Sequence, residues 1–335
     1  MDDGRPVVGI TLGDPAGIGP EIVLGALSGS EVHERCTPVV IGDAGILRRC
    51  AGVTGISPGP LQVLQAPGEA SGKPGVVEVV HVETPGVHEV RPGTHGREAG
   101  VAAEAFIKRA CEFGLSGRID AIATAPINKE SLRLAGIPHI GHTEMLASYL
   151  GAASPLTLFL TGKLRIFFLS RHLSLRQAVD YITQERVYEF IHQVHAAMTA
   201  LGFREPAIGL AALNPHASDG GQFGDEETEH LVPATKRAVA DGIRVSGPIG
   251  ADSVFNMALE GRFDCVISLY HDQGHIAAKT RDFYRTVTAT LNLPVLRTSV
   301  DHGTAFDIAW QGKADPISMK AAIIAAADLL AARRV

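Results

Sequence analysis

The sequence is poor in cysteine, in aromatic residues and in positive charge. Its four cysteines, among 335 residues, form no C-x-x-C pair and no zinc-finger spacing. A disulfide framework and a cysteine zinc site are therefore not expected. Aromatic residues make up 5% of the chain, and the formal net charge is −6. The chain thus lacks the basic face and the stacking platforms typical of nucleic-acid-binding proteins, and we expect no nucleic-acid partner.

Long apolar runs are also missing. The longest apolar stretch, residues 321–332, is interrupted by Asp328 and is too short to span a bilayer. The N-terminal residues show no basic segment followed by an apolar one, so no signal peptide is expected. These absences predict a soluble, cytoplasmic protein without a membrane partner.

What the sequence does contain is an alternation of short β-branched runs with longer helical patterns. Several of the short runs are continuously apolar, which is typical of strands covered on both faces. This alternation predicts an α/β fold with a largely parallel sheet. Segment 52–92, rich in Gly and Pro, is expected to be irregular or a hairpin insertion. Strands are expected at 7–12, 38–42, 76–82, 119–124, 155–160, 164–169, 207–213 and 264–270, and helices at 21–27, 98–113, 175–201, 226–240 and 317–334.

Three histidines directly follow three of the expected strands. His172 follows the strand at 164–169, His216 the strand at 207–213, and His271 the strand at 264–270. In open α/β sheets the carboxyl ends of the strands are where ligands bind. Three imidazoles converging there would form a divalent-metal site with an open coordination position. Each histidine alone is also compatible with a polar loop or a capping residue.

Two further segments suit an anionic ligand. In Gly141–Glu144 (GHTE), before an expected helix, Thr143 is expected as the cap and Glu144 in the first turn. His142 beside this cap could bind an anion or act as an acid or base. Lys279 and Arg297 flank the strand-like run 286–291, and a cationic pair there suits a carboxylate or phosphate substrate.

Two glycine-containing segments bear on nucleotide binding. Gly13–Glu21 follows the first strand and opens a helix, but it lacks both the P-loop lysine and the third glycine of G-x-G-x-x-G. An anion site at the helix start and a structural turn remain alternatives for it. The run 301–309 is rich in donors and small residues, and such a loop can wrap an adenosine while Asp307 accepts from its ribose hydroxyls.

Six motifs, in order over nearly the whole chain, resemble the 4-hydroxythreonine-4-phosphate dehydrogenase family of the vitamin B6 pathway and its paralogues. The run 302–309 also resembles the nucleotide-binding loop of isopropylmalate and isocitrate dehydrogenases. The six motifs are Gly13–Glu21 (GDPAGIGPE), Thr124–Lys129 (TAPINK), Gly141–Glu144 (GHTE), Leu213–Ala217 (LNPHA), Tyr270–Gly274 (YHDQG) and Arg297–Ala305 (RTSVDHGTA).

The resemblance implies two α/β/α lobes flanking a cleft, as in isocitrate and isopropylmalate dehydrogenases, and not a classical Rossmann fold. We expect one catalytic unit of two interleaved lobes, roughly 1–140 with 300–335 in one and 141–299 in the other. The resemblance also implies a homodimer with the active site at the subunit interface.

The resemblance further implies roles for individual residues, with metal ligands contributed across the dimer interface. The implied metal ligands are His172, His216 and His271, and the implied substrate contacts are His142, Thr143, Lys279, Thr288 and Arg297. The implied catalytic residues near the metal are Lys279, Asp272 and Asp252, and the implied NAD contacts are Gly303, Thr304 and Asp307.

The sequence departs from the family pattern mainly in the segment expected to contact the substrate. Thr288 stands where the biosynthetic family has Asn, the Gly-rich stretch after Lys279 is missing, and Trp310 replaces a usual Gly. The substrate alternatives are therefore 4-phospho-D-threonate or 4-phospho-D-erythronate, 4-hydroxythreonine 4-phosphate, and the cis-dihydrodiol of terephthalate.

The expected activity is the metal- and NAD-dependent oxidative decarboxylation of a small anionic 3-hydroxy acid. Lys279, Asp272 and a metal-bound water are alternatives for the base, and NADP is an alternative to NAD. Three imidazoles favour zinc, cobalt or nickel, whereas Asp252 and Asp272 would admit manganese or magnesium. A metal-dependent hydrolase or lyase without NAD, and a binding protein that keeps the metal without turnover, are the alternatives from other classes.

Overall fold

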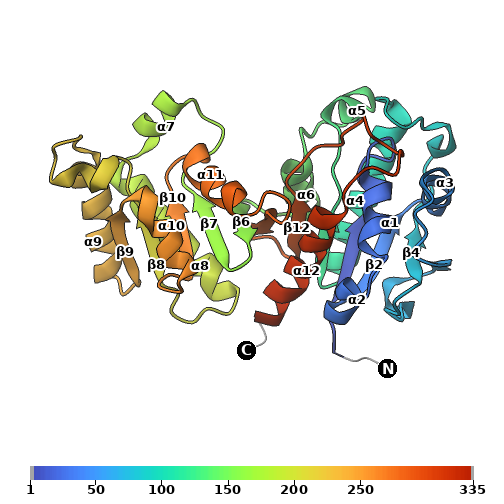
Figure 1. Cartoon of the computed structure of the whole chain (residues 1–335), viewed down its shortest axis with the longest axis horizontal. Helices are drawn as coiled ribbons and strands as arrows, with labels where there is room; N and C mark the ends of the chain where they lie inside the picture. Colours follow the sequence, from blue (N-terminus) through green and yellow to red (C-terminus); the bar gives the residue numbers. More distant parts are fainter. Residues whose placement is uncertain (1–3, 333–335) are drawn as a thin grey trace. The chain divides into compact units, whose positions relative to one another are not determined.

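The structure is a computed structural model that describes residues 4–332. The described chain forms two compact units, the first comprising residues 4–156 and 287–331 and the second residues 157–286. Figure 1 shows that each unit has its own strands and its own helices, and the strands of the two units are called here the first and the second sheet. Segments 141–156 and 287–299 belong to the first unit, whereas the sequence estimate assigned them to the other lobe. His142, Thr143, Thr288 and Arg297 therefore lie in the first unit.

The first unit is built on a mainly parallel sheet in the order β3-β4-β2-β1-β5-β12-β11. Its neighbouring strands are parallel except for β11, which runs antiparallel to β12. Every residue of β2, β5 and β12 is buried, as expected for strands covered on both faces. The strands are β1 (Val7–Thr11), β2 (Thr37–Gly42), β3 (Leu61–Leu64), β4 (Val77–His81), β5 (Ala121–Thr124), β11 (Val287–Leu291) and β12 (Leu296–Val300).

The helices of the first unit cover both faces of this sheet. On one face, Phe113 of α4 and Met145 of α6 share a core with Ile122 of β5. On the other face, the Thr298 hydroxyl of β12 donates to the Ala322 carbonyl of α12 at 2.8 Å. Successive strand residues point to opposite faces, so Arg297 points toward the α4 and α6 face. The helices are α1 (Gly19–Ala26), α2 (Glu31–Arg35), α3 (Ala44–Thr54), η1 (Pro67–Glu69), η2 (Val87–Glu89), α4 (Arg97–Leu115), α5 (Lys129–Leu134), α6 (His142–Leu150) and α12 (Ile317–Ala332).

The second unit has a sheet in the order β6-β7-β10-β8-β9. Strands β6 and β7 form an antiparallel hairpin, and β7, β10, β8 and β9 are parallel to one another. The carboxyl ends of β7, β10 and β8 therefore meet at one edge of this sheet. The strands are β6 (Leu156–Thr161), β7 (Leu164–Phe168), β8 (Ile208–Ala211), β9 (Val245–Ile249) and β10 (Cys265–Ser268).

Helices α10 and α11 pack on this second sheet, where Val254 and Ala278 share a core with Val266 of β10. Helices α8 and α9 contact each other, and α9 contacts β9. The helices are α7 (Leu175–Tyr181), α8 (Gln184–Ala200), η3 (Pro215–Asp219), the π-helical η4 (Glu227–Leu231), α9 (Val232–Ala240), α10 (Ala251–Leu259) and α11 (His271–Arg281).

The α/β class with a largely parallel sheet is confirmed, and two local expectations are wrong. The helix expected at 175–201 is two helices, because Ile182 is extended and the Thr183 hydroxyl accepts from the Arg186 amide to start α8. Segment 52–92 is not a hairpin, because β3 and β4 within it pair in parallel at the edge of the first sheet. All four cysteines are buried and unpaired, as the sequence indicated.

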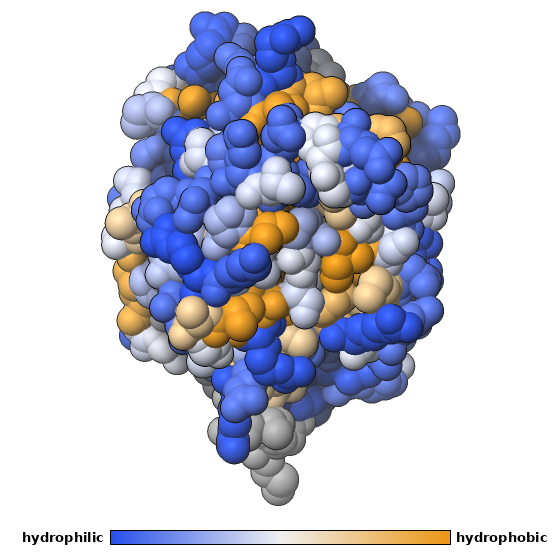
Figure 2. All heavy atoms as spheres, turned by 90° about the vertical axis from the view of Figure 1, so that its left-hand side faces the viewer, coloured by the Kyte–Doolittle hydropathy of each residue, from blue (hydrophilic) through white to orange (hydrophobic). Residues whose placement is uncertain are grey.

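The surface on the side of α9 and β9 is mainly hydrophilic, and its hydrophobic residues form small groups among hydrophilic ones (Figure 2). Exposed large hydrophobic side chains in the second unit include Phe223 and Val239. Within residues 4–332, no helix combines the length and the apolar character that crossing a membrane requires.

Candidate active site

The three histidines singled out in the sequence lie at one edge of the second sheet. His172 is in the loop after β7, His271 is the first residue of α11 after β10, and His216 is in the segment after β8. Strands β7 and β8 both pair in parallel with β10, which places all three segments at the same edge. This is the edge at which open α/β sheets bind their ligands.

Two of these rings lie close together. The ring centroids of His172 and His271 are 6.5 Å apart. Two imidazoles on one zinc ion have centroids roughly 5 Å apart, so the observed separation is longer than shared coordination requires. His271 Nδ1 lies 2.6 Å from the Asp272 carboxylate, which leaves Nε2 for a ligand. A carboxylate on the other ring nitrogen is the arrangement that orients metal-binding imidazoles.

His216 lies in a strained turn that a buried carboxylate supports. Four consecutive non-glycine residues from His216 onward have positive φ, with 54° at His216 itself. Such backbone persists only where the surroundings hold it. The buried Glu227 carboxylate accepts the amides of Leu213 at 2.9 Å and Asn214 at 2.7 Å, and the Asn214 side chain at 2.8 Å. Glu227 therefore fixes the start of the turn, a role that sequence reasoning missed.

Two buried polar side chains join the ends of the three strands. The Gln273 amide nitrogen donates to the Ala212 carbonyl at 2.7 Å, and its oxygen accepts the Leu269 amide at 2.8 Å. The Ser170 hydroxyl donates to the Leu269 carbonyl at 2.9 Å. Ser170, Leu269 and Ala212 each lie within four residues of one of the three histidines. Gln273 and Ser170 thus fix the spacing of the three histidine-bearing segments.

His275, which the sequence analysis left without a role, supports His271. The two rings stack with centroids 3.7 Å apart and planes 12° from parallel, and His275 Nδ1 lies 2.8 Å from the His271 carbonyl oxygen. Phe159 and Phe168 enclose the other side of the His275 ring at 4.3 and 4.6 Å. The i, i+4 spacing of the two histidines on one helix was the signal that could have shown this contact.

The second unit brings the histidines to one edge without completing a metal site. In the described part of the chain, no three His, Cys, Asp or Glu side chains are grouped so as to hold a metal ion. Of the three histidines, His172 and His271 form the pair whose rings are close. The assignment of all three as ligands to one ion stays a prediction.

The acidic residues and the lysine expected near the metal are spread along the same unit. Asp272 is exposed at the start of α11, and Asp252 is exposed in the first turn of α10, after β9. Lys279 is eight residues after His271 on α11, a separation of about 12 Å along the helix axis. Its Nζ lies 5.3 Å from the centre of the Phe283 ring. The catalytic roles of these residues stay predictions.

The first unit holds a buried cation that no carboxylate neutralises. The Arg297 side chain is 6% exposed, and its Nε and Nη2 donate to the Thr124 hydroxyl at 3.1 and 2.8 Å. Its Nη1 donates to the Thr290 hydroxyl at 3.2 Å. Within residues 4–332, no acidic side chain pairs with it. Burial lowers the pKa of Arg297 to about 9. Such a site favours an anion from solution, because a buried charge without a counter-ion is costly.

His142 lies beside this cation. It is the first residue of α6, and its Nε2 is shielded from solvent without a hydrogen-bond partner. Burial, and then the charge of Arg297, lower the pKa of His142 well below its ordinary value, so the ring is neutral near pH 7. The expectation that Thr143 caps the helix is wrong, because α6 starts two residues earlier, at His142, with the extended Gly141 at its N-cap. Glu144 lies in the first turn, as expected.

Thr288 lies on the same face of the sheet as the contacts of Arg297. On β11, Thr288 is opposite Ser299 and Thr290 is opposite Arg297. Residues two apart on a strand share a face, so Thr288 and Thr290 both point to the side of Arg297. His142, Thr288 and Arg297 thus belong to one region of the first unit, and their role as substrate contacts stays a prediction.

Three motifs meet at the carboxyl ends of the adjacent parallel strands β1, β5 and β12. The Thr304 carbonyl accepts the Ile18 amide at 3.0 Å, and the Thr304 hydroxyl accepts from the Asn128 side chain at 3.4 Å. A Cβ on Gly17 would lie 2.9 Å from Thr304, which explains the glycine. Next to Thr304, Gly303 has open space around it, and Asp307 is exposed. The loop can therefore receive a ligand.

Trp310 adopts a backbone conformation that favours glycine. Its φ is 59°, in the left-handed region that glycine adopts without a steric penalty. The side chain is buried, and the Arg49 guanidinium lies 5.2 Å from the ring centre. Packing against Arg49 offsets part of the backbone strain.

These features define a class of protein: a two-unit α/β protein whose polar groups gather at the carboxyl ends of parallel strands. It has a buried cation that no described acidic side chain neutralises and a loop, 301–309, with exposed residues. The family model described as "Pyridoxal phosphate biosynthetic protein PdxA" matches residues 34–326. The chain belongs to the PdxA family.

Relatives and solved structures agree with this assignment. The chain is 47% identical over 327 residues to a Clostridium botulinum protein named "Putative D-threonate 4-phosphate dehydrogenase", with 98% of each chain covered. It is 40% identical, with a TM-score of 0.90, to a 4-hydroxythreonine-4-phosphate dehydrogenase from Klebsiella pneumoniae, covering 97% of this chain and 100% of that one. A terephthalate 1,2-cis-dihydrodiol dehydrogenase from Burkholderia xenovorans is 29% identical with a TM-score of 0.63, covering 94% and 95%. These names support assignment of the chain to the oxidoreductases.

Proposed function

We propose that this protein oxidises and decarboxylates D-threonate 4-phosphate, or a close phosphorylated 3-hydroxy acid, with NAD and one divalent metal ion. D-erythronate 4-phosphate and 4-hydroxythreonine 4-phosphate are the neighbouring substrates to compare. The proposal is supported by the names of its relatives, at 47% identity for the D-threonate 4-phosphate enzyme and 40% for the 4-hydroxythreonine 4-phosphate enzyme.

The observation that carries the proposal is the unneutralised charge of Arg297. Among the described residues, hydroxyls of Thr124 and Thr290 hold this guanidinium and no carboxylate does, so its charge stays available to an anion. Phosphate and carboxylate groups both bind guanidinium through paired hydrogen bonds. A phosphorylated hydroxy acid supplies both groups, and the neutral His142 ring can hydrogen-bond to one of them.

The histidines of the second unit suit a divalent metal. His172, His216 and His271 would hold the ion, and Asp272 would orient the His271 ring. Zinc is the preferred assignment for imidazole ligands, with cobalt, nickel, manganese and magnesium as alternatives. When bound, the metal supplies a Lewis acid that lowers the pKa of the substrate alcohol and stabilises developing negative charge.

The loop at 301–309 suits the dinucleotide. Asp307 would accept hydrogen bonds from the adenosine ribose. Gly303 and Thr304 would lie in contact with the nucleotide. In the overall reaction the secondary alcohol loses its hydride to NAD and its proton to a base, and the resulting β-keto acid loses CO₂. Lys279 and Asp272 are the alternatives that this chain offers for the base. NADP is the alternative cofactor, and parallel assays with both dinucleotides decide between them.

The proposal includes a homodimer that completes the metal site between subunits. Supporting it is the observation that, among the described residues, one chain does not group three metal-binding side chains. Light scattering of the purified protein tests the dimer, and a monomer at working concentration would contradict it. The proposal also keeps a cytoplasmic location, with no nucleic-acid or membrane partner.

The experiment is to mix purified protein with NAD, zinc or manganese, and D-threonate 4-phosphate, and to follow NADH absorbance and CO₂ release together. Unphosphorylated D-threonate and the Arg297→Met variant are the controls, and both should lose most of the rate. NADH from none of the three phosphorylated acids would overturn the proposal. Substrate consumption without NADH would indicate a hydrolase or lyase, and turnover of only the terephthalate cis-dihydrodiol would indicate a dicarboxylate substrate.

A further inference from the structure

The loop that precedes α4 is fixed against two of the family motifs. The Gly93 amide donates to the Ala16 carbonyl at 2.8 Å, within GDPAGIGPE. A Cβ on Gly93 would lie 2.8 Å from the Phe306 carbonyl oxygen, and Gly93 has a φ of 75°. The loop can therefore follow this path only with glycine at this position, and its next residues lie beside the run that carries Thr304 and Asp307.

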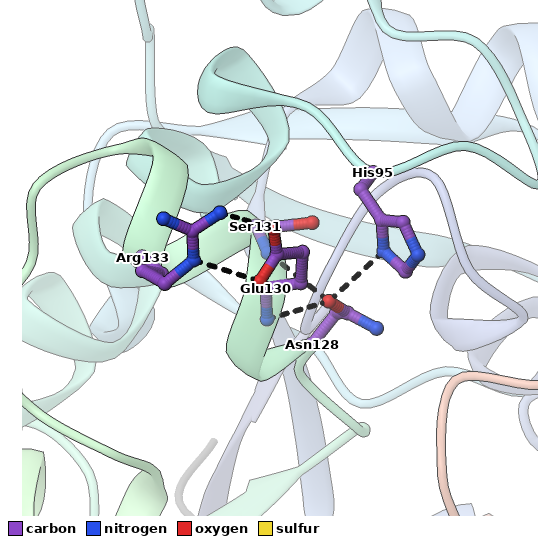
Figure 3. A network of polar contacts seen from close by, with 5 residues as sticks. All are labelled: His95, Asn128, Glu130, Ser131 and Arg133. Carbon is purple, nitrogen blue, oxygen red and sulfur yellow. Dashed lines mark hydrogen bonds and ion pairs between the residues drawn. The ribbon is translucent and has the colours of Figure 1, made fainter.

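His95 of this loop is held by Asn128 (Figure 3). The Asn128 Oδ1 accepts the amides of Glu130 at 2.9 Å and Ser131 at 3.0 Å, and it lies 3.1 Å from His95 Nδ1. Because two backbone donors identify this atom as the oxygen, His95 must donate from Nδ1. The outer nitrogen, Nε2, is then left for a further partner, and His95 is exposed to solvent.

Both residues of this pair also contact the 301–309 run. The His95 ring packs on Phe306 with centroids 4.9 Å apart and planes 48° apart. The Asn128 amide nitrogen donates to the Thr304 hydroxyl at 3.4 Å. His95 is therefore attached, directly and through Asn128, to the loop that carries the expected nucleotide contacts.

The surroundings of this pair carry unneutralised positive charge. Arg91 and Arg97 flank His95 in sequence, and Lys129 follows Asn128. All three are exposed, and none is paired with a carboxylate in the part of the chain that the structure describes. Two carboxyl groups also act on His95. Glu130 is engaged by Arg133 Nε at 2.9 Å, and burial raises the pKa of the Asp14 carboxyl. The charge of the three basic side chains favours a ligand with more than one negative charge.

We propose that His95 binds the diphosphate of the dinucleotide cofactor through Nε2 and that Asn128 is its positioning residue. The inference rests on the proposed function, because it assigns a contact within the cofactor site. In this contact Nε2 donates to a phosphate oxygen while Nδ1 still donates to Asn128, so the bound ring carries a proton on each nitrogen. Arg91, Arg97 and Lys129 add attraction over a longer range.

The test is calorimetric titration of the whole protein with ADP-ribose, which carries the diphosphate but no nicotinamide. In His95→Phe the ring can still pack on Phe306 but both hydrogen bonds are lost, and in His95→Ala both features are lost. We expect each variant to weaken ADP-ribose binding about tenfold, as for one lost charge-assisted hydrogen bond. Arg109→Gln, which removes a partly exposed arginine paired with Glu112 farther along α4, is the matched control and should bind as the wild type does.

Each outcome decides the inference. Wild-type affinity in His95→Phe together with weak binding in His95→Ala would show that only packing matters and would overturn the diphosphate contact. A shift in the emission of Trp310, the single tryptophan, in His95→Phe would indicate a rearranged loop and would also overturn it. If the wild type binds neither NAD nor ADP-ribose, the proposed cofactor itself fails. If His95→Phe binds ADP-ribose as the wild type does, the role of His95 is refuted and the proposed cofactor is not.

Discussion

The Thr124 hydroxyl accepts two hydrogen bonds from the Arg297 guanidinium, from Nε at 3.1 Å and from Nη2 at 2.8 Å. The two residues come from adjacent parallel strands, β5 and β12. Thr124 begins the TAPINK motif and Arg297 begins RTSVDHGTA, so this contact couples two motifs far apart in sequence. A hydroxyl orients the guanidinium without neutralising it, which keeps the charge available for an anion.

Replacing Arg297 by Met should raise the stability of the protein and lower its activity. The variant removes a buried charge that lacks a counter-ion, so the free energy of unfolding should rise by about 1–2 kcal/mol in anion-free buffer. Turnover should fall about a hundredfold or more, because the anion loses its charged partner. Urea unfolding with and without inorganic phosphate checks this prediction. Phosphate should stabilise the wild type and leave Arg297→Met unchanged.

The matched control is Arg35→Met, which removes an exposed arginine that faces Asp328 at 3.5 Å. Its unfolding free energy should change by less than about 0.5 kcal/mol, with or without phosphate. If Arg297→Met instead lowers the free energy of unfolding by as much as the loss of a core side chain does, the account of an unneutralised cation is contradicted.

The neutral ring of His142 predicts a pH dependence of stability. Its pKa is well below 6.5 in the folded protein because of burial and the Arg297 charge, whereas the unfolded chain titrates near 6.5. Below that pH the unfolded state therefore binds more protons, and stability falls as the pH falls. Between pH 7 and pH 5 the wild type should lose up to about 2 kcal/mol more than His142→Gln in urea unfolding.

The control for this pH series is His88→Gln, because His88 is exposed on the surface. Its unfolding free energy should follow that of the wild type over the same range. If His142→Gln also follows the wild type, His142 does not remain neutral in the folded protein as its surroundings require.

The sequence alone was sufficient to predict the α/β class and the edge at which the histidines lie. Strand β10, for example, is an apolar run that ends shortly before His271. Such a pattern can be recognised from neighbouring residues alone, without knowledge of distant contacts. The strands β3 and β9 were missed because their residues are partly exposed and lack a clear apolar run. Strand β12 was missed although it is fully buried, because three of its five residues, in LRTSV, are polar. The hairpin alternative for segment 52–92 failed because strand direction depends on which distant strand is the partner.

The supporting residues of the site could not be predicted in the same way. Glu227 and Gln273 act through hydrogen bonds to Asn214 and to Ala212, which are 13 and 61 residues away in sequence. No local pattern marks a buried carboxylate or amide as the partner of a distant backbone group. The role of His275 was different, because its spacing of four from His271 on one helix could have indicated the contact.

Glu227→Gln should weaken metal binding without unfolding the protein. The buried carboxylate accepts the Leu213 and Asn214 amides and the Asn214 side chain, and an amide cannot accept all three. The strained turn carrying His216 would then relax, and metal affinity should fall about 10- to 100-fold. Zinc titration by calorimetry measures this fall. Glu229→Gln, exposed on the same π-helical segment, should keep wild-type affinity, and equal losses in both variants would contradict the role of Glu227.

Mixing inactive variants tests whether the metal site is shared between subunits. His172→Ala, His216→Ala and His271→Ala should each lose zinc and activity as homodimers. If two ligands come from one subunit and one from its partner, co-refolding any two variants whose histidines come from different subunits regenerates one intact site in each mixed dimer. Two of the three pairwise mixtures should then recover about a quarter of the wild-type activity, because half of the dimers are mixed and each holds one working site of two. The third mixture, in which both substitutions affect ligands from the same subunit, should stay inactive and so identify the ligand that the partner supplies. If no mixture recovers activity, then all three imidazoles come from a single chain. In that case the His216 ring must move close to the rings of His172 and His271 when the metal binds.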